Sequence, residues 1–257
     1  MIGVLVPVSQ LSFNHIINAI YVGVTLALCQ GVGQVINQYA DVEIDKMAKP
    51  YRPLPAGILT REEALGFGWL LSIFVMGRAF TVSTIFGIAV LVLLFLSVFY
   101  SLAPFSPRKV HPILNLAWLS ISRGLMPMIA VLTIYGNLGQ ALPYALLATI
   151  WVFGFQATKD IPDVEADKKY GIKTVPNTYG TWGLKTLMLA STAAYVAITI
   201  TLGKPLMLLT IPLAITAILG LERKTVTENT LGWTCFYLGL ALQYLLILVG
   251  RFTIQPF

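Results

Sequence analysis

The sequence predicts an all-α membrane protein whose helices form one polytopic bundle. Three observations lead to this fold class. First, 57% of the 257 residues are hydrophobic and 11% are charged, with a mean hydropathy of +0.79, whereas a soluble domain carries about 25% charged residues. Second, the apolar runs are long enough to cross a bilayer, which takes roughly 20 residues. Third, basic residues are concentrated in alternate loops, as in a chain that crosses a membrane repeatedly.

The apolar runs predict eight membrane segments within a single membrane domain. They fall at about 12–40, 61–79, 82–102, 111–136, 140–160, 181–202, 204–221 and 230–252. Two boundaries carry local signals. Thr60 is followed three residues later by Glu63, the pattern of a capping box that begins a helix. Gly203 before Lys204 and Pro205 indicates that one helix stops and the next begins.

Lysine and arginine residues predict the orientation of these segments. The loops that follow the odd-numbered segments hold 12 of the 17 basic residues. By the positive-inside rule these loops are cytoplasmic, and both chain ends lie outside. The net charge of +6 is therefore read as loop charge that sets topology, and no nucleic acid is expected as a partner. The twelve residues are Lys46, Lys49, Arg52, Arg61, Arg108, Lys109, Lys159, Lys168, Lys169, Lys173, Arg223 and Lys224.

Acidic residues gather at the same end as the basic loops. All eleven lie there, and seven of them fall in two stretches, NQYADVEIDKMAKPYRPLPAG at 37–57 and KDIPDVEADKKYGIKTVP at 159–176. Asp and Glu contribute little to topology, so the positive-inside rule does not account for this concentration. The cytoplasmic end of the bundle therefore needs carboxylates for another reason.

The first stretch places polar side chains at helical spacing. Asn37, Asp41 and Asp45 follow one another at intervals of four residues, so they share one face if the first helix continues through them. Gln30 and Gln34 extend this polar stripe into the membrane. Polar side chains at that depth must face the bundle interior or a wet cavity.

The second stretch repeats this spacing. Asp163 and Asp167 are four residues apart, and Asp160 comes three residues before Asp163. Carboxylate and amide oxygens suit Mg²⁺, which binds one or two carboxylates together with the phosphates of a substrate. Two clusters therefore suggest two or more Mg²⁺ ions that clamp one diphosphate. A single Asp at a helix end is often a solvated cap, but two matching clusters on one side of the membrane favour a binding site.

Basic residues beside the two stretches are candidates to neutralise the remaining phosphate charge. They are Lys46, Arg52, Arg108, Lys109 and Lys168. The apolar bundle behind this site would take a hydrocarbon tail. A ligand with a diphosphate head and an apolar tail is an isoprenyl diphosphate, which the sequence therefore predicts as the substrate of a protein surrounded by membrane lipid.

Four stretches resemble a known family. N-Q-x-x-D-x-x-x-D followed by KPYRPLPAG resembles the first signature of the UbiA-type intramembrane prenyltransferases, and KDIPDVEADKKYGIKT resembles the second. YSLAPFSPRK at 100–109 and SRGLMP at 122–127 are similar to the family's middle segment. Within the family, the residues of these stretches are most similar to the homogentisate prenyltransferase and chlorophyll synthase branch. The resemblance covers about residues 12–180, and the last three helices match only by hydropathy.

The resemblance implies a fold, an activity and roles for single residues. Members of the family form two four-helix halves, here about 1–110 and 111–257, around a central lipid-open cavity. Most catalyse Mg²⁺-dependent transfer of a prenyl chain to an aromatic or lipid acceptor. The residues implied to hold Mg²⁺ and the diphosphate are Asn37, Asp41, Asp45, Asp160, Asp163 and Asp167. Further implied site residues are Arg52, Lys109, Lys168 and Arg123, as contacts to phosphate, and Tyr100, as a catalytic residue.

The sequence departs from the family in two places. At the second position of the first signature, where the family commonly has Asp, this sequence has Gln38. In this respect it resembles the homogentisate branch. The family usually has nine helices, with one before the helix of the first signature, whereas only eleven residues precede the first segment here. We expect either a truncated start or an eight-helix variant. Acceptor binding would be affected, because that first helix often lends polar groups to the acceptor.

Aromatic side chains are a further requirement of this chemistry. Loss of the diphosphate leaves a carbocation, which needs aromatic faces and exclusion of water. The candidates are Tyr39, Phe99, Tyr100, Trp118, Trp151, Phe153 and Phe155, all of which also suit membrane-core packing or an interfacial belt.

Two alternatives to prenyl transfer stay open from the sequence. A UbiA-type intramembrane terpene cyclase would ionise the same substrate and cyclise it without an acceptor. A transporter with acidic gates would have its site near the middle of the membrane, whereas these carboxylates lie at one end. Product analysis with a prenyl diphosphate alone separates the first alternative from transfer, and release of diphosphate excludes the second.

Overall fold

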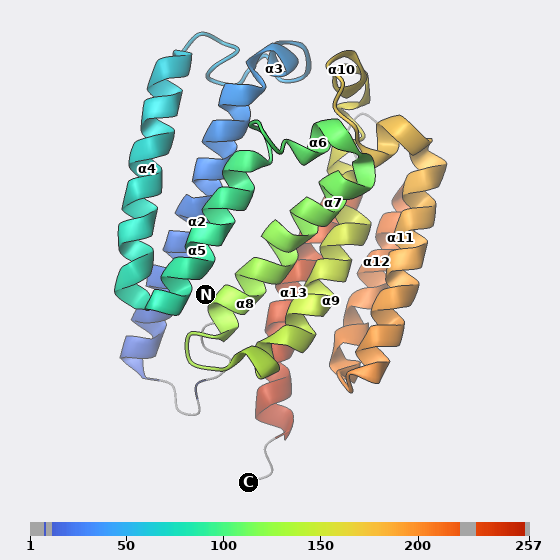
Figure 1. Ribbon diagram of the computed structural model, residues 1–257. Coiled ribbons are helices and arrows are strands. Elements are labelled where there is room, and N and C mark those ends of the chain that lie inside the picture. Colours follow the sequence, from blue (N-terminus) through green and yellow to red (C-terminus); the bar gives the residue numbers. More distant parts are fainter. Residues whose placement is uncertain (1–7, 9–11, 222–229, 255–257) are drawn as a thin grey trace.

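The protein is a bundle of long helices that run side by side (Figure 1). The computed structural model describes residue 8, residues 12–221 and residues 230–254. Helices and short connections account for these residues, and no strand occurs among them. The predicted all-α class is confirmed.

Eight apolar helical rods in the described part of the chain match the eight predicted segments. Six are long and apolar enough to cross a membrane, and two shorter apolar helices, Thr84–Phe99 and Pro205–Gly220, complete the set. The helices of these rods are α2 (Phe13–Ala40), α4 (Arg61–Val82), α5 (Thr84–Phe99), α7 (Pro112–Ser120), α8 (Met126–Leu132), α9 (Leu138–Phe155), α11 (Val175–Thr201), α12 (Ile211–Gly220) and α13 (Thr230–Ile254). A π-helical turn, Ile121–Leu125, joins α7 to α8, and 3₁₀ turns precede α12 (Pro205–Thr210) and follow α9 (Gln156–Asp160).

Helix ends follow the local chemistry of the sequence. The Thr60 hydroxyl accepts a hydrogen bond from the Glu63 N–H (3.2 Å), and the Glu63 carboxylate accepts one from the Thr60 N–H (2.8 Å). The predicted capping box at the start of α4 is therefore confirmed. Gly203 follows the end of α11 with a φ of +63°, a left-handed conformation that a residue without a Cβ adopts at little cost.

A short helical stretch precedes the segment predicted at 181–202. α11 begins at Val175, but Gly180 has non-helical backbone angles (φ 68°, ψ −173°), so the continuous helix of this rod starts after Gly180, as predicted. Asn177 accepts a hydrogen bond from the Thr174 N–H (3.0 Å), and Pro176 lies in the first turn, where its missing N–H is not needed. These two residues start the helix within a stretch that is too polar to count as an apolar run.

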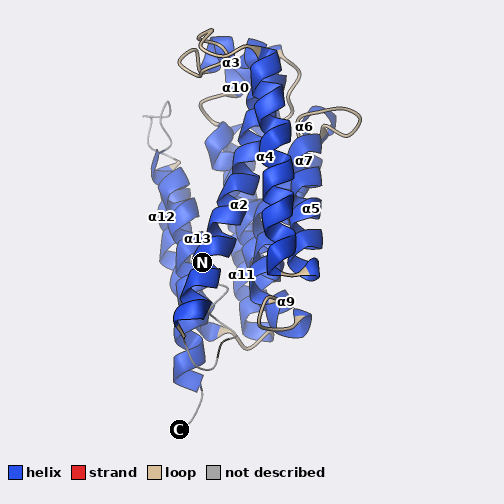
Figure 2. Ribbon diagram, turned by 90° about the vertical axis from the view of Figure 1, so that its left-hand side faces the viewer, coloured by secondary structure: helices blue, strands red, loops and turns tan. Residues whose placement is uncertain are grey.

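Short helices cover one end of the bundle. α3 (Val42–Ala48), α6 (Pro107–Val110) and α10 (Val164–Lys169) lie together there, at the top of Figure 1. The view turned by 90° in Figure 2 shows the same three helices at the same end. The loops predicted to be cytoplasmic thus share this end, except that Arg223 and Lys224 lie outside the described residues. Which side of the membrane this end faces stays a prediction.

A tight contact holds α13 against α9. The side chain of Trp151 on α9 is 1% exposed, and its Nε1 donates a hydrogen bond to the Phe236 carbonyl of α13 (3.0 Å). Gly239 of α13 faces the same ring, where an added Cβ would lie 1.9 Å from the Trp151 Cζ2. The absence of a side chain at Gly239 therefore sets how closely α13 approaches the rest of the bundle.

Gly239→Ala should destabilise the protein, because a methyl group has no room against the buried Trp151 ring. Overpacking of this kind costs about 1–3 kcal/mol, so the purified variant should melt at a lower temperature in detergent. Gly77→Ala on α4 is the matched control, since no described heavy atom lies within 4 Å of its added Cβ. This control should melt at or above the wild-type temperature because Ala favours helix. Equal melting temperatures for the two variants would contradict the proposed contact.

Candidate active site

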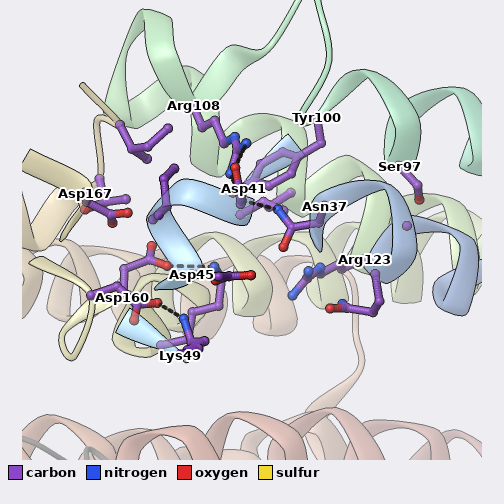
Figure 3. Close-up of a pocket in the computed structure, with 18 of the residues that line it drawn as sticks. Asn37, Asp41, Asp45, Lys49, Ser97, Tyr100, Arg108, Arg123, Asp160 and Asp167 are labelled. Atoms are coloured by element: carbon purple, nitrogen blue, oxygen red, sulfur yellow. Dashed lines mark hydrogen bonds and ion pairs between the residues drawn. The ribbon is translucent and has the colours of Figure 1, made fainter. Parts of the chain in front are cut away.

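A cavity of about 580 Å³ lies where the long helices meet the short helices at one end of the bundle (Figure 3). Residues of α2, α3, α5, α6, α10 and α13, of the π-helical turn and of the 3₁₀ turn after α9 line it. It is the candidate site because both carboxylate-rich stretches reach it. The charged residues of its lining are Asp41, Asp45, Lys49, Arg52, Arg108, Arg123, Lys159, Asp160, Asp163 and Asp167.

We call Asn37, Asp41 and Asp45 the first row, and Asp160, Asp163 and Asp167 the second row. The two rows are built alike. Asp41 precedes α3 and Asp163 precedes α10, each with φ near −100° and ψ near 0–15°. The Asp45 N–H donates to the Asp41 carbonyl and the Asp167 N–H donates to the Asp163 carbonyl, both at 2.8 Å. In each row a short helix thus presents a second Asp one turn after the first.

The first row does not lie on one continuous helix, so the condition under which its residues were predicted to share a face is not met; the first segment ends at Ala40, as predicted. α2 ends at Ala40, and Asp41 adopts φ −105° and ψ 15°. The Asp41 N–H nevertheless donates to the Asn37 carbonyl (2.9 Å), and the spacing of four residues is kept across the break. Asn37, Asp41 and Asp45 therefore still reach one cavity, as the sequence predicted.

Basic side chains neutralise the first row. The guanidinium of Arg108 on α6 donates to both carboxylate oxygens of Asp41, and both residues are buried. The Asn37 amide donates to Asp41 Oδ2 (2.7 Å) and to the Ser101 hydroxyl (3.1 Å). Arg52 donates to Asp45 Oδ2 (2.7 Å). Charge-assisted bonds of this kind satisfy carboxylates that would otherwise be costly to bury.

The second row is neutralised partly by the first stretch. Lys159 donates to Asp160 (2.6 Å). The Lys49 ammonium, which follows α3, reaches across to Asp163 (2.5 Å). The Lys49–Asp163 ion pair joins residues 114 positions apart in the sequence, and it brings the two rows to the same rim of the cavity.

Asp167 differs from the other carboxylates of the cavity. Within the described part of the chain, no side chain forms an ion pair or a hydrogen bond with its carboxylate, and the residue is buried, with 8% of its surface exposed. Burial, followed by the nearby charges of Asp160 and Asp163, raises the pKa of Asp167 to about 7. A carboxyl group that exchanges its proton near neutral pH is therefore part of the site.

The structure brings ten of the predicted site residues to the cavity. Besides the six members of the two rows, Arg52, Tyr100, Arg108 and Arg123 line it. Three predicted phosphate contacts are not part of the lining: Lys46, Lys109 and Lys168 are exposed. Lys46 instead pairs with Glu43 (3.1 Å) on the outer face of α3. Its position one residue after Asp45 turns it away from the face that carries the row.

Two basic residues that line the cavity were not among the predicted phosphate contacts. Lys49 and Lys159 both line it. Lys49 continues the interval of four residues that begins at Asn37, so the helical spacing that selected Asp41 and Asp45 also contained the signal for Lys49. Lys159 had no such signal, because it lies in a 3₁₀ turn whose geometry the sequence does not reveal.

Most of the aromatic residues predicted for the site do not line the cavity. Of the seven proposed aromatic residues, Tyr100 alone is among the described residues that line the cavity. Trp151 and Phe155 stack on each other in the core, 4.6 Å between centroids. The aromatic lining comes instead from α13, where Trp233 and Tyr237 pack edge to face at 4.6 Å. That helix carries no sequence motif that could have selected them.

Tyr100 has an environment that keeps it a neutral phenol. Burial raises its pKa above the ordinary value of a tyrosine, against the opposing charge of Lys159. The Arg108 guanidinium carbon lies 5.5 Å from the centroid of the Tyr100 ring. The ring therefore offers an aromatic face and a hydroxyl proton beside the first row.

The two rows suit Mg²⁺ that binds together with a diphosphate. Their six side chains offer oxygen donors, which this ion prefers. Among the described residues, no three carboxylates converge closely enough to hold a metal ion by themselves. Mg²⁺ commonly binds one or two carboxylates and completes its coordination with waters and substrate phosphates. The donor set therefore fits an ion shared with a substrate better than a preformed metal cage.

Comparison with known proteins identifies relatives of this chain. The model of the UbiA prenyltransferase family matches residues 3–238. A "Digeranylgeranylglyceryl phosphate synthase" of Thermococcus sibiricus is 34% identical over 154 residues, which cover 58% of this chain and 51% of that protein. A "Probable homogentisate phytyltransferase 2, chloroplastic" of Oryza sativa subsp. japonica is 34% identical over 170 residues, 60% of this chain and 44% of that protein. The chain thus spans about half the length of these curated relatives.

Solved structures share the fold. A UbiA homolog from Aeropyrum pernix K1 superposes with a TM-score of 0.69 and 22% identity, covering 98% of this chain and 94% of that one. A UbiA homolog from Archaeoglobus fulgidus bound to GPP and Mg²⁺ superposes with a TM-score of 0.68 and 18% identity, covering 96% and 95%. Together with the apolar helices, the family match identifies an integral membrane protein.

Asp167→Asn should change how the stability of the metal-free protein depends on pH. The folded protein holds the Asp167 proton up to about pH 7, whereas an unfolded chain releases it near pH 4. The free energy of unfolding should therefore fall as the pH rises from about 4 to 7, by at most about 4 kcal/mol. Asn does not titrate, so the melting temperature of the variant should rise relative to that of the wild type as the pH increases over this range.

Melting curves at pH 4.5 and pH 8 in a chelator measure this effect. Glu165→Gln is the control, because Glu165 is an exposed carboxylate on the same short helix. A difference between wild type and Asp167→Asn that stays the same at both pH values would show that Asp167 titrates normally.

Proposed function

Because this chain belongs to the UbiA prenyltransferase family, we propose that it is an Mg²⁺-dependent intramembrane prenyltransferase. In this proposal it ionises an isoprenyl diphosphate and transfers the prenyl group to an aromatic or other hydrophobic acceptor. The observation that carries the proposal is the meeting of two carboxylate rows at one rim of a cavity, linked by the Lys49–Asp163 ion pair. A single row would fit a solvated helix end equally well, whereas two rows facing one cavity fit a ligand with several phosphate oxygens.

The two rows are the proposed binding site for Mg²⁺ and the diphosphate head. Asn37, Asp41 and Asp45 on one side, and Asp160, Asp163 and Asp167 on the other, would hold two or more ions. When bound, Mg²⁺ stabilises the negative charge that develops on the leaving diphosphate. The Archaeoglobus fulgidus neighbour was solved with GPP and Mg²⁺, which supports this ligand class.

Four cations of the cavity would change partners when the substrate binds. Lys49, Arg52, Arg108 and Lys159 each contact a carboxylate of the rows. With the carboxylates engaged by Mg²⁺, the same ammonium and guanidinium groups would be available to phosphate oxygens. Arg suits this exchange particularly well, because its planar guanidinium donates in pairs to carboxylate and to phosphate alike.

In the proposed transfer step, the allylic C–O bond breaks, and its electron pair leaves with the diphosphate. An electron pair of the acceptor forms the new bond to the allylic carbon, and the acceptor proton goes to a carboxylate or to the diphosphate. The aromatic faces of Tyr100, Trp233 and Tyr237, which line the cavity, would stabilise the positive charge of the prenyl group and help exclude water.

Cyclisation without an acceptor would use the same ionisation step. The relatives named above give it no support over transfer, and no feature of the cavity favours it. The short helices α3 and α10, which carry or follow the carboxylates of the rows, lie at one end of the bundle and not midway along it (Figure 1), which disfavours a transporter site as well.

Asp41→Asn and Asp163→Asn test the proposal, one residue from each row. In membranes supplied with Mg²⁺, a prenyl diphosphate and an acceptor, each should lower the rate of diphosphate release and of product formation by about 100-fold or more, as expected for lost stabilisation of a developing charge. Glu43→Gln and Glu165→Gln are matched controls on α3 and α10, because both side chains are exposed and neither lines the cavity.

Full turnover by either row variant would exclude the diphosphate clamp. Cyclic products formed by the wild type in the absence of any acceptor would replace transfer with cyclisation. Melting temperatures of all four variants separate a loss of activity from a loss of folded protein.

A further inference from the structure

Asn115 is a buried amide that does not line the cavity. It lies on α7, in a rod long enough to span the membrane, and 1% of its surface is exposed. Among the described residues, its Nδ2 has one hydrogen-bond acceptor, the Lys173 carbonyl at 3.2 Å, and its Oδ1 has no partner. Burying an amide that is only half satisfied costs free energy. The single bond to Lys173 is therefore the feature of Asn115 that calls for an explanation.

Lys173 connects the segment after the second row to α6. Its N–H donates to the Arg108 carbonyl (2.6 Å), and its Nζ donates to the Val110 carbonyl (3.0 Å). The last four carbonyls of a helix lack partners within the helix, and α6 has only four residues, Pro107–Val110. Lys173 lies 63 positions after Val110, so α6 is capped by a distant part of the chain.

The position of α6 depends on this cap. A helix of four residues is not stable on its own, yet α6 carries Arg108, whose guanidinium binds both carboxylate oxygens of Asp41 (Figure 3). Asn115 holds the carbonyl of the same Lys173, which is thereby fixed at both its N–H and its carbonyl. A chain of contacts thus runs from Asn115 through Lys173 and Arg108 to Asp41. It joins the second-row segment to the first row independently of the ion pair between the rows.

We propose that Asn115 is a positioning residue for binding of the diphosphate. By holding Lys173 it fixes α6, and with α6 the Arg108 guanidinium, at the place from which Arg108 reaches Asp41 and, with substrate bound, a phosphate oxygen. The inference rests on the proposed prenyl transfer, which gives Arg108 its contact to phosphate. Asn115 itself touches neither substrate nor Mg²⁺. An error of about 1 Å in placing a functional group can lower a rate by about 100-fold, so an amide that acts only through Arg108 has a measurable effect.

The experiment measures the Kd of the purified protein for geranyl diphosphate with Mg²⁺ by calorimetric titration in detergent. Asn115→Leu keeps the approximate volume of the side chain and removes the amide. We expect it to raise this Kd by about tenfold, as for one weakened hydrogen bond to a charged group, and to lower the rate of diphosphate release by about tenfold or more. A purely structural role would lower the melting temperature and the number of binding sites per protein, and would leave the Kd unchanged.

A double-mutant cycle tests whether Asn115 acts through Arg108. Arg108→Gln should weaken binding more than Asn115→Leu does, because it removes the guanidinium itself. Adding Asn115→Leu to Arg108→Gln should then change the Kd less than about twofold, whereas independent effects would multiply. Ser120→Ala is the matched control, because Ser120 is buried on α7, donates to the Leu116 carbonyl of its own helix and does not line the cavity. It should keep the wild-type Kd.

The outcomes separate this inference from the proposed function. If Asn115→Leu binds with the wild-type Kd, or if its effect multiplies with that of Arg108→Gln, the positioning role is wrong while prenyl transfer stands. If the wild type binds geranyl diphosphate with Mg²⁺ but releases no diphosphate, prenyl transfer is wrong, and the Kd values alone decide the role of Asn115. Failure of the wild type to bind would overturn both. If Asn115→Leu does not fold, Asn115→Gln, which keeps the amide but displaces it, replaces it in the cycle with the same expected results.

Discussion

Charge neutralisation in a small space at the end of a membrane bundle governs this structure. Five carboxylates line one cavity, and two like charges 4 Å apart repel by roughly 4 kcal/mol at an effective dielectric constant of 20. Basic side chains placed between the carboxylates at the rim of the cavity offset this repulsion. Arg108 binds Asp41 from α6, Arg52 binds Asp45 from the loop after α3, and Lys49 crosses from one row to the other. The ion pairs thereby fix the relative positions of segments that are remote in the sequence.

The short helices of the rim depend on these contacts. α3 has seven residues and α10 has six, and isolated helices of such length are not stable in water. α3 is held by the ion pair of its Asp45 with Arg52, and α10 by the ion pair of Asp163, the residue just before it, with Lys49. Because the cations that hold the rim are also suited to phosphate, a ligand would exchange the partners of charges that the protein already holds there, and no further charged side chain would have to move into the cavity. The same groups can therefore give the rim its order in both states.

The sequence was informative where a single physical rule acts along the chain. Hydropathy located the eight helical rods, and the interval of four residues located Asn37, Asp41 and Asp45 on one face. The sequence was uninformative where two residues of the same type lie close together and only the tertiary structure determines which of them reaches the cavity. Lys46 and Lys49 follow the same row, yet one faces solvent beside Glu43 and the other reaches Asp163. That outcome depends on the position of α10, which no local pattern contains. The aromatic lining was missed for the same reason, since α13 reaches the cavity through its packing on Trp151.

Two arginines within membrane-spanning helices, Arg78 and Arg123, show how a structural charge differs from one that lines a binding cavity. Arg78 donates to the Tyr21 carbonyl and to the Thr25 hydroxyl, both at 3.2 Å, and its guanidinium carbon lies 3.8 Å from the centroid of the Tyr21 ring. These contacts offset much of the cost of placing a guanidinium in a membrane. Arg123 also lies in a membrane-spanning rod and, among the described residues, has none of these compensations, although its helix is packed tightly against α9. Because a charge without compensation lowers stability, the position of Arg123 in the lining of the cavity fits the proposed binding of an anionic substrate there.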